Sequence, residues 1–394
     1  MDSVTYDVVI LGGGPAGLAT SLSLLQHNAA LRVAVVERAG YDRPRIGETL
    51  PPNAQALLQQ LSVWSSFMEQ THLPAYGTSA AWGSAELLSN EFFFSLHGPG
   101  WHLDRCAFDA MLAKAAVQRG AELYKHTQVL DCQHQPGQHW QIAAQTGDGA
   151  PWQLSARFVV DATGRLAWFA RQQGAQPVVY DQLTGVAVLL EVDSTRVDTY
   201  ALVEACELGW WYSALLPAGR LMVMCLSDAD LIKQQRLKSP SVWLAQACQT
   251  RHTQERLRHA RPLGRPATYA ARTQCLQQTA GANWLAVGDA ASTFDPLSSQ
   301  GITKALRSGI FASYAILDWF KGQSAGLERC ADLHAREFQQ YRATWASYYA
   351  LEQRWPHAPF WQRRGQPQFV ADHRGVFGQA GENDEYAYIK NKLL

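Results

Sequence analysis

The sequence predicts an α/β fold in which a mostly parallel sheet with helices is interleaved with an antiparallel sheet and followed by a helical C-terminal segment. Three observations predict it. A short apolar strand near the N-terminus runs into a glycine-rich turn and a helix. Two later strands also end in an acidic residue and a glycine turn. Between residues 171 and 264 the chain carries a series of short alternating strands, which is typical of an antiparallel sheet.

Length and composition set the broad class. With 394 residues, 47% of them hydrophobic, the chain suits one large or two interleaved domains with a real core. Its 34 basic residues balance 34 acidic ones, so charge gives no support to binding nucleic acid. The seven cysteines are odd in number and include no Cys-x-x-Cys pair. We therefore expect neither a disulfide framework nor a metal site.

The N-terminus and the hydropathy pattern bear on location. The chain starts almost at once with a strand-like run from Tyr6 to Leu11 and lacks the basic stretch, apolar run and cleavage site of a signal peptide. No apolar run approaches the ~20 residues that span a bilayer. The longest candidate, Gly185 to Leu190, has the length of a strand. We therefore expect a cytoplasmic protein with no membrane partner.

Residues 6–37 carry the strongest local signal. Gly12, Gly14 and Gly17 form a G-x-G-x-x-G match between a strand and a helix, and a second strand then ends at Glu37. The first glycine permits a tight turn, the second lets a pyrophosphate approach the backbone, and the third allows close packing of helix on strand. Glu37 is placed to bind ribose hydroxyls. The segment predicts dinucleotide binding, because a turn used only for packing explains Gly17 but not Glu37.

Distant segments decide which dinucleotide is bound. One opens a helix that lasts to about Gly120, two repeat the pattern of a strand ending in an acid and a glycine turn, and one is a proline- and serine-containing loop. They are Leu103-Asp104-Arg105-Cys106-Ala107-Phe108-Asp109, Phe158-Val-Val-Asp161-Ala162-Thr163-Gly164, Trp284-Leu-Ala-Val-Gly288-Asp289-Ala290-Ala291 and Asp295-Pro296-Leu297-Ser298-Ser299-Gln300-Gly301-Ile302.

In this order, the segments resemble the FAD-dependent monooxygenase superfamily, which includes aromatic hydroxylases, geranylgeranyl reductases and tryptophan halogenases. The resemblance covers about residues 4–330 and implies a Rossmann-like FAD-binding domain. It implies that Glu37 binds the adenosine ribose, Arg105 the phosphate and ribityl region, and Asp289 the ribityl chain. Asp161 and Asp289 could instead be ordinary strand-end caps.

The resemblance also implies that Gly301 and Ile302 begin a helix whose amides face the flavin pyrimidine ring. A positive helix end there would stabilise the anionic reduced flavin. The full set of expected cofactor-binding residues is Gly12, Gly14, Pro15, Ala16, Gly17, Glu37, Arg38, Arg45, Thr49, Arg105, Asp161, Ala162, Gly164, Gly288, Asp289, Pro296, Gly301 and Ile302.

The electron donor stays open. No second glycine fingerprint follows residue 17, so the sequence encodes no dedicated nicotinamide domain. The resemblance implies that NAD(P)H or a separate reductase meets the flavin only transiently, with O2 as cosubstrate.

The resemblance divides the chain into interleaved parts. Residues 1–72, 100–170 and 265–330 are expected to build the FAD-binding domain, and residues 73–99 and 171–264 the substrate domain. The latter would hold strands at Phe92–Leu96, Thr184–Val192, Thr199–Glu204, Trp211–Leu216 and Leu221–Leu226, forming an antiparallel sheet over the flavin. Residues 331–394 are expected to form a C-terminal helix and a tail.

Three departures separate the chain from tryptophan halogenases. Those enzymes need a lysine in their first hundred residues, whereas this chain has none before Lys114. Their glutamate in the Asp-Pro-Leu loop is replaced by Ser298. Their Trp-x-Trp-x-Ile-Pro signature is replaced by Trp-Trp-Tyr-Ser-Ala-Leu-Leu-Pro at residues 210–217. Halogenation is therefore not expected.

The segment Gly47-Glu48-Thr49-Leu50-Pro51 and the aromatic strand at residues 210–212 look most like the flavoprotein maturases of cysteine tryptophylquinone-dependent glycine or lysine oxidases. That resemblance implies an FAD-dependent monooxygenase that hydroxylates a tryptophan residue of a partner oxidase precursor, by way of a flavin C4a-hydroperoxide. Shielding from water and positioning of the indole would supply most of the catalysis.

Candidate positioning residues lie on the aromatic strand, in the Glu48 segment and in the Asp-Pro-Leu loop. They are Glu48, Trp211, Tyr212, Ser298, Ser299 and Gln300, with Trp210 beside them. For the tryptophans plain core packing is an equal alternative, because large aromatic side chains are commonly buried. Glu48 could equally be a capping or FAD-contacting residue.

Other functions stay open at this point. A small-molecule aromatic monooxygenase would have a closed pocket, and a prenyl reductase would have a long apolar tunnel and would insert no oxygen. A flavin-binding chaperone that holds the unmodified oxidase precursor is the alternative that involves no catalysis.

Overall fold

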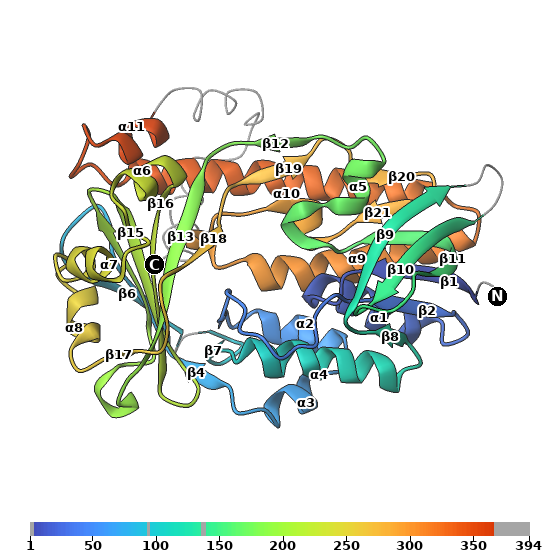
Figure 1. Cartoon of the computed structure of the whole chain (residues 1–394), viewed down its shortest axis with the longest axis horizontal. Helices are drawn as coiled ribbons and strands as arrows, with labels where there is room; N and C mark the ends of the chain where they lie inside the picture. The colour runs from blue at the N-terminus through green and yellow to red at the C-terminus, as the bar shows by residue number, and fades with distance from the viewer. Residues whose placement is uncertain (1–3, 93–94, 135–138, 366–394) are drawn as a thin grey trace.

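The computed structural model describes residues 4–92, 95–134 and 139–365. Figure 1 shows two large sheets, one at each end of the elongated molecule, with two long helices running between them. The α/β fold expected from the sequence is confirmed.

The first sheet is built around two strands that are buried on both faces. β1 (Val4–Leu11) lies between β11 (Trp152–Asp161) and β2 (Val33–Val36), and it is parallel to both. Their β-branched, apolar sequences suit a parallel sheet covered on both sides. The order is β20-β21-β11-β1-β2-β8, and the β9–β10 hairpin extends β11. The remaining strands are β8 (Glu122–Tyr124), β9 (Thr127–His134), β10 (Trp140–Thr146), β20 (Ala280–Gly281) and β21 (Trp284–Ala286).

Three helices cover one face of this sheet. α1 (Pro15–His27) packs against both α9 (Gly301–Phe320) and α4 (Arg105–Gln118). Gly309 of α9 makes the closest approach possible, because a Cβ there would lie 2.5 Å from the Ala16 carbonyl oxygen. This packing brings the starts of α1 and α9 to the same end of the sheet.

The second sheet contains the strands expected between residues 171 and 264. Its order is β17-β13-β16-β15-β14-β5-β6, and β18 also pairs with β13. All its pairs are antiparallel except β14 with β5. The strands are β5 (Gly77–Ala81), β6 (Leu88–Glu91), β13 (Leu183–Glu191), β14 (Ala201–Cys206), β15 (Gly209–Leu216), β16 (Arg220–Asp228), β17 (Arg261–Pro262) and β18 (Ala267–Ala270).

The strand expected at Phe92–Leu96 is wrong. The strand in that region is β6, which ends at Glu91. Glu91 pairs with Gly77, the first residue of β5, so the pairing with β5 ends there. Ser95 and Leu96 are not in a strand, and residues 93–94 lie outside the described part. The aromatic run misled the prediction because aromatic residues favour strands only where a neighbouring strand is there to pair with them.

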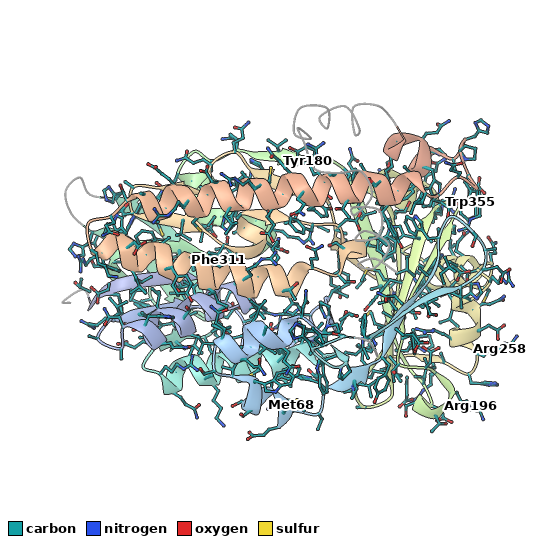
Figure 2. The ribbon with its side chains drawn as sticks, turned by 180° about the vertical axis from the view of Figure 1, so that it is seen from behind. Met68, Tyr180, Arg196, Arg258, Phe311 and Trp355 are labelled. Carbon is teal, nitrogen blue, oxygen red and sulfur yellow. The ribbon has the colours of Figure 1, made fainter. Side chains whose placement is uncertain are left out.

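α10 (Ala325–Ala350) follows α9 and runs back along it toward the second sheet. Figure 2 shows the two helices lying side by side, with Phe311 on α9 and Trp355 beyond the end of α10, beside the second sheet. α11 (Pro359–Arg364) then buries Phe360 and Trp361 in the core between α10 and that sheet. The C-terminal segment expected at residues 331–394 therefore includes α11 as well as most of α10, and its residues 366–394 lie outside the described part.

Short elements complete the fold. Two three-stranded sheets are formed by β3 (Thr49–Leu50), β7 (Gly100–His102) and β4 (Leu73–Ala75), and by β12 (Pro177–Val179), β19 (Gln274–Leu276) and β22 (Ser292–Thr293). The short helices are α2 (Ala54–Gln60), α3 (Trp64–Met68), α5 (Trp168–Gln172), α6 (Ala229–Gln234), α7 (Pro240–Ala247) and α8 (Thr253–Leu257).

Candidate active site

The glycine turn after β1 has two glycines that the fold requires and one that leaves the backbone open. Gly12 has φ +114°, and a Cβ there would lie 2.2 Å from the Ala162 carbonyl oxygen. A Cβ at Gly17 would lie 2.0 Å from the Gly12 carbonyl oxygen. A Cβ at Gly14 would meet no atom within 4 Å, and the backbone there is extended, a conformation that any residue can adopt. Pro15 and Ala16 begin α1 directly after it.

Glu37, at the end of β2, closes this turn from the side. Its carboxylate accepts hydrogen bonds from the Gly13 and Ala39 amides at 2.7 and 2.9 Å. It also forms an ion pair with Arg45 at 3.1 Å. Arg38 is exposed, so it does not share this pairing.

An ionic chain leads from Glu37 to the segment before Glu48. Asp109, on α4, lies 3.4 Å from Arg45 and 3.0 Å from Arg105. Arg105 donates its remaining hydrogen bonds to the carbonyl oxygens of Ile46 and Gly47, at 2.9 and 3.0 Å. The guanidinium therefore fixes the backbone that carries Glu48.

The turn after β11 is built by the fully buried Asp161. Its carboxylate accepts hydrogen bonds from the backbone amides of Thr163 and Ala170 and from the Thr163 hydroxyl. Those bonds shape the turn through Ala162 and Gly164, and they also fix the start of α5. Burial raises the pKa of Asp161, although these hydrogen bonds oppose the shift.

The turn after β21 places Asp289 between two cations. Lys304, on α9, lies 3.0 Å from Asp289 Oδ1, and Arg165 lies 3.5 Å from Oδ2. Lys304 also donates to the Ser292 carbonyl, and only 2% of its side chain is exposed. Burial raises the pKa of Asp289, but the two cations outweigh it and hold the pKa below its ordinary value. One turn further along α9, the Ser308 hydroxyl accepts from the Gly288 amide at 2.8 Å.

The Asp-Pro-Leu loop is anchored by the buried Asp295. Its Oδ1 accepts from the Leu297 amide, and its Oδ2 accepts from the Trp345 indole and the Tyr349 hydroxyl of α10. Burial raises the pKa of Asp295 to about 6. The loop beyond it stays open to solvent, because Pro296, Ser299 and Gly301 are exposed, whereas Ser298 and Gln300 are half-buried and Ile302 is buried.

Glu48 is a buried carboxylate with one oxygen that has no hydrogen-bond partner among the described residues, referred to below as the idle oxygen. Its side chain is 3% exposed, Oε2 accepts from the Gly47 amide at 3.0 Å, and Oε1 has no hydrogen-bond partner among the described residues. Burial raises the pKa of Glu48 to about 7, although the charge of Arg105 opposes the shift. The group therefore changes its charge near neutral pH.

Thr49 links this segment to the second sheet. Its hydroxyl lies 2.7 Å from the Tyr212 hydroxyl of β15 and 3.3 Å from Nδ1 of His102 on β7. Glu48 and Tyr212 therefore lie close together, and the negative charge of Glu48 is one reason, after burial, that the pKa of Tyr212 is raised.

The aromatic strand places its three large side chains on two different faces. Trp210 and Tyr212 lie on the inner face of β15, where the Trp210 indole donates to the Tyr349 hydroxyl at 3.0 Å. Trp211 lies on the outer face, 1% exposed, with its ring 5.2 Å from that of Trp243. Neighbouring residues of a strand point to opposite faces, so the structure does not bring Trp211 to the group around Glu48.

The starts of α1 and α9 fit a phosphate-bearing and anionic group. No side chain caps either helix, so their first amides keep their hydrogens for another acceptor. A Cβ at Gly301 would meet no atom within 4 Å, as at Gly14. Both helix starts therefore present uncovered backbone donors next to the acid-ended turns.

The FAD binding domain family matches residues 5–326. The chain belongs to this family. LodB of Marinomonas mediterranea, for which a role as an FAD-dependent oxidoreductase is proposed, is 32% identical over 363 residues, or 91% of this chain and 97% of LodB. The predicted FAD-dependent monooxygenase superfamily is confirmed.

Two solved structures show how widely the FAD-binding fold is shared. The myxobacterial chondrochloren halogenase CndH has a TM-score of 0.81 at 20% identity, covering 98% of this chain and 88% of its own. The peptidyl tryptophan dihydroxylase QhpG, essential for tryptophylquinone cofactor biogenesis, has a TM-score of 0.73 at 24% identity, covering 92% of this chain and 79% of its own. At these identities the likeness establishes the fold.

Several residues of this FAD-binding protein were missed in the sequence. Lys304, Asp109 and His102 hold predicted site residues in place. Asp109 follows Arg105 by four residues on one helix. This spacing favours an ion pair, so the sequence could have predicted the contact between the two side chains. Lys304 follows Gly301 in the first turn of α9, where a lysine opposes the helix dipole and therefore suggests a nearby carboxylate.

Within residues 4–92, 95–134 and 139–365, no group of three or more His, Cys, Asp or Glu side chains is arranged to hold a metal ion. No helix within the same ranges combines the length and the apolar character needed to cross a membrane.

Proposed function

We propose that this protein is an FAD-dependent monooxygenase that hydroxylates a tryptophan residue of a partner, the precursor of a quinone-dependent amino-acid oxidase, during biogenesis of cysteine tryptophylquinone. The likeness to QhpG, which is named for dihydroxylating a peptidyl tryptophan, supports a substrate of this kind. The proposed domain division is the one expected from the sequence, with the substrate bound between the two large sheets.

The observation that carries the proposal is the buried Glu48 with its idle Oε1. Hydroxylation of an indole ring carbon ends with loss of the proton from that carbon. A carboxylate with a pKa of about 7 is ionised in a useful fraction at neutral pH and is basic enough to accept that proton. Glu48 is therefore the proposed general base.

The sequence supports oxygen insertion over halogenation. Halogenation in the superfamily relies on a lysine in the first hundred residues, and the first lysine of this chain is Lys114. Ser298, in the Asp-Pro-Leu loop, offers a hydroxyl where halogenases carry a carboxylate.

Bound FAD would supply oxygen transfer from O2, with two electrons from NAD(P)H or a separate reductase. One oxygen atom enters the ring and the other leaves as water. The amides at the start of α9 would stabilise negative charge on the cofactor. Tyr212, Ser298, Ser299 and Gln300 would line the place where the indole lies and would keep water away from it.

The test is the intact mass of the oxidase precursor after co-expression with this protein and without it. A gain of one or two oxygen atoms that maps to a tryptophan is the expected result. The Glu48→Gln variant should bind FAD and fail to raise the mass, which separates chemistry from precursor binding. An unchanged mass with FAD-loaded wild-type protein would overturn the proposal in favour of a small aromatic substrate or a prenyl chain.

The Asp289→Asn variant tests the chaperone alternative. A variant that has lost FAD should also lose the mass gain if the protein is a monooxygenase. A precursor that still matures with the FAD-free variant would instead identify a protein that only holds its client.

A further inference from the structure

The hydrogen bonds of His102 determine which of its ring nitrogens carries a hydrogen. His102 is fully buried, and its Nε2 lies 2.9 Å from the Thr199 carbonyl oxygen. A carbonyl oxygen only accepts, so Nε2 carries a hydrogen. No carboxylate is hydrogen-bonded to the ring in the described part of the chain, and burial lowers the pKa of His102 to about 4. The imidazole is therefore neutral, and Nδ1 is an acceptor.

The Thr49 hydroxyl must then give its one hydrogen to His102. It lies 3.3 Å from Nδ1, which can only accept, and 2.7 Å from the Tyr212 oxygen. Because the Thr49 hydrogen points to His102, the Thr49 oxygen can only accept a hydrogen bond from Tyr212. Tyr212 therefore donates to Thr49, and all the hydrogens of the group point away from Tyr212.

This direction leaves the Tyr212 oxygen with lone pairs and no hydrogen to offer. No donor points to that oxygen from the residues that the structure describes. The Glu48 carboxylate, whose Oε1 has no hydrogen-bond partner among the described residues, is near enough for its charge to raise the pKa of Tyr212, so a second acceptor is close by. Tyr212 is half-buried on the inner face of β15.

We propose that the Tyr212 oxygen accepts a hydrogen bond from the indole N–H of the substrate tryptophan, and that Thr49 and His102 hold Tyr212 in this accepting state. The inference rests on the proposed function and names the atom by which the ring is recognised. Holding the ring nitrogen fixes which ring carbons face the cofactor and Glu48. A site built in this way rejects a ring that lacks the donor, because the buried acceptor is then left unpaired.

The experiment compares rings that differ at one position. FAD-loaded protein is titrated with free indole and with benzothiophene, in which sulfur replaces N–H, and binding is followed by the flavin absorbance. Oxidase precursor carrying tryptophan or benzothienylalanine at the target position is compared in the same way. Wild-type protein should bind the N–H ring about tenfold more tightly in both comparisons.

Three variants separate recognition from structure. Tyr212→Phe should bring the two rings to within about twofold of each other, by weakening indole only. Thr49→Val frees the Tyr212 hydrogen and should also reduce the preference, whereas Thr49→Ser keeps the hydroxyl and should retain it. Because Thr49 is itself an expected cofactor-binding residue, the two rings are compared at saturating FAD in all three variants and in the wild type.

Equal binding of the two rings by wild-type protein would overturn the inference. It would also be overturned if Tyr212→Phe weakened FAD binding and left the ring preference intact, because the oxygen would then face the cofactor. Failure of the proposed function is a separate result. In that case the tryptophan precursor gains no oxygen, and the comparison of free indole with benzothiophene still decides the role of Tyr212.

Discussion

Glu48 shows how the position of one residue sets its chemistry. A carboxylate at the surface is ionised at neutral pH, and its proton affinity is too low for it to act as a strong base. Burial of Glu48 without a partner for Oε1 moves its pKa to about 7, where ionised and protonated forms coexist. The Arg105 charge limits this shift, so the ionic chain through Asp109 also tunes Glu48.

This shift makes the stability of the apoprotein depend on pH. The pKa of Glu48 is about 7 in the folded state and close to 4.5 when the chain is unfolded, so folding favours the protonated form. The penalty for ionising it is absent below about pH 4 and grows as the pH rises to 7, reaching on the order of 3 kcal/mol. Glu48→Gln should therefore raise the melting temperature of the apoprotein at pH 8 and leave it unchanged at pH 4.

The control for that measurement is Glu207→Gln, in the exposed turn between β14 and β15. It should change neither melting temperature by more than about 1 °C. A Glu48→Gln variant that melts at the wild-type temperature at both pH values would contradict the shift.

Residues whose partners are close in sequence could be predicted, and residues whose partners are distant could not. The glycine turn and Glu37 follow from local spacing. The pairing of Thr49 with Tyr212 joins positions 163 residues apart, so nothing in the sequence around either indicates it. The position of Trp211 could be predicted in part. Once residues 210–212 are known to form a strand, the two-residue period places Trp211 and Tyr212 on opposite faces of the sheet.

At the scale of elements, the β1–α1 turn separates folding from cofactor binding. Gly14→Ala should fold like the wild type, because the added methyl group meets no atom, but should bind FAD at least tenfold more weakly where the pyrophosphate would approach. Gly17→Ala should lower the melting temperature of the apoprotein, because its Cβ collides with the Gly12 carbonyl. Thermal melting of the apoprotein and fluorescence titration with FAD distinguish the two. Loss of stability in Gly14→Ala would contradict this assignment.

Helix α9 holds the Asp289 turn with two side chains one turn apart, Lys304 and Ser308. Lys304→Met should raise the dissociation constant of FAD about tenfold, because Asp289 loses the partner that fixes its orientation. Lys321→Met, which removes an exposed lysine at the end of the same helix, is the matched control and should have no effect. Equal FAD affinities for Lys304→Met and wild type would show that Asp289 is held well enough by Arg165.

At the scale of the whole molecule, α10 connects the two large sheets. Tyr349 donates to Asp295 of the loop before α9 and accepts from Trp210 of the second sheet. Trp345 donates to the same carboxylate. One buried hydrogen-bonded group on α10 thus joins the second sheet to the loop before α9, the helix that packs on the first sheet.

Tyr349→Phe tests that connection. It leaves the buried Trp210 N–H without an acceptor and Asp295 with one donor fewer, so it should cost about 1–3 kcal/mol of unfolding free energy. Tyr348→Phe is the neighbouring control, since the contacts described for Tyr348 involve its ring and its backbone carbonyl. Chemical denaturation of both variants provides the measurement. Similar losses in the two would mean that ring packing, and not the hydroxyl, joins the sheets.

The interleaved order of the first sheet also governs how the protein is made. A ribosome that has released β1, α1 and β2 has produced the glycine turn, but β11 at residues 152–161 and α9 at residues 301–320 do not yet exist. Contacts between such distant segments form late in folding. The cofactor therefore cannot be captured during translation of the first half, and the cell passes through a completed, flavin-free chain whose abundance depends on its supply of FAD.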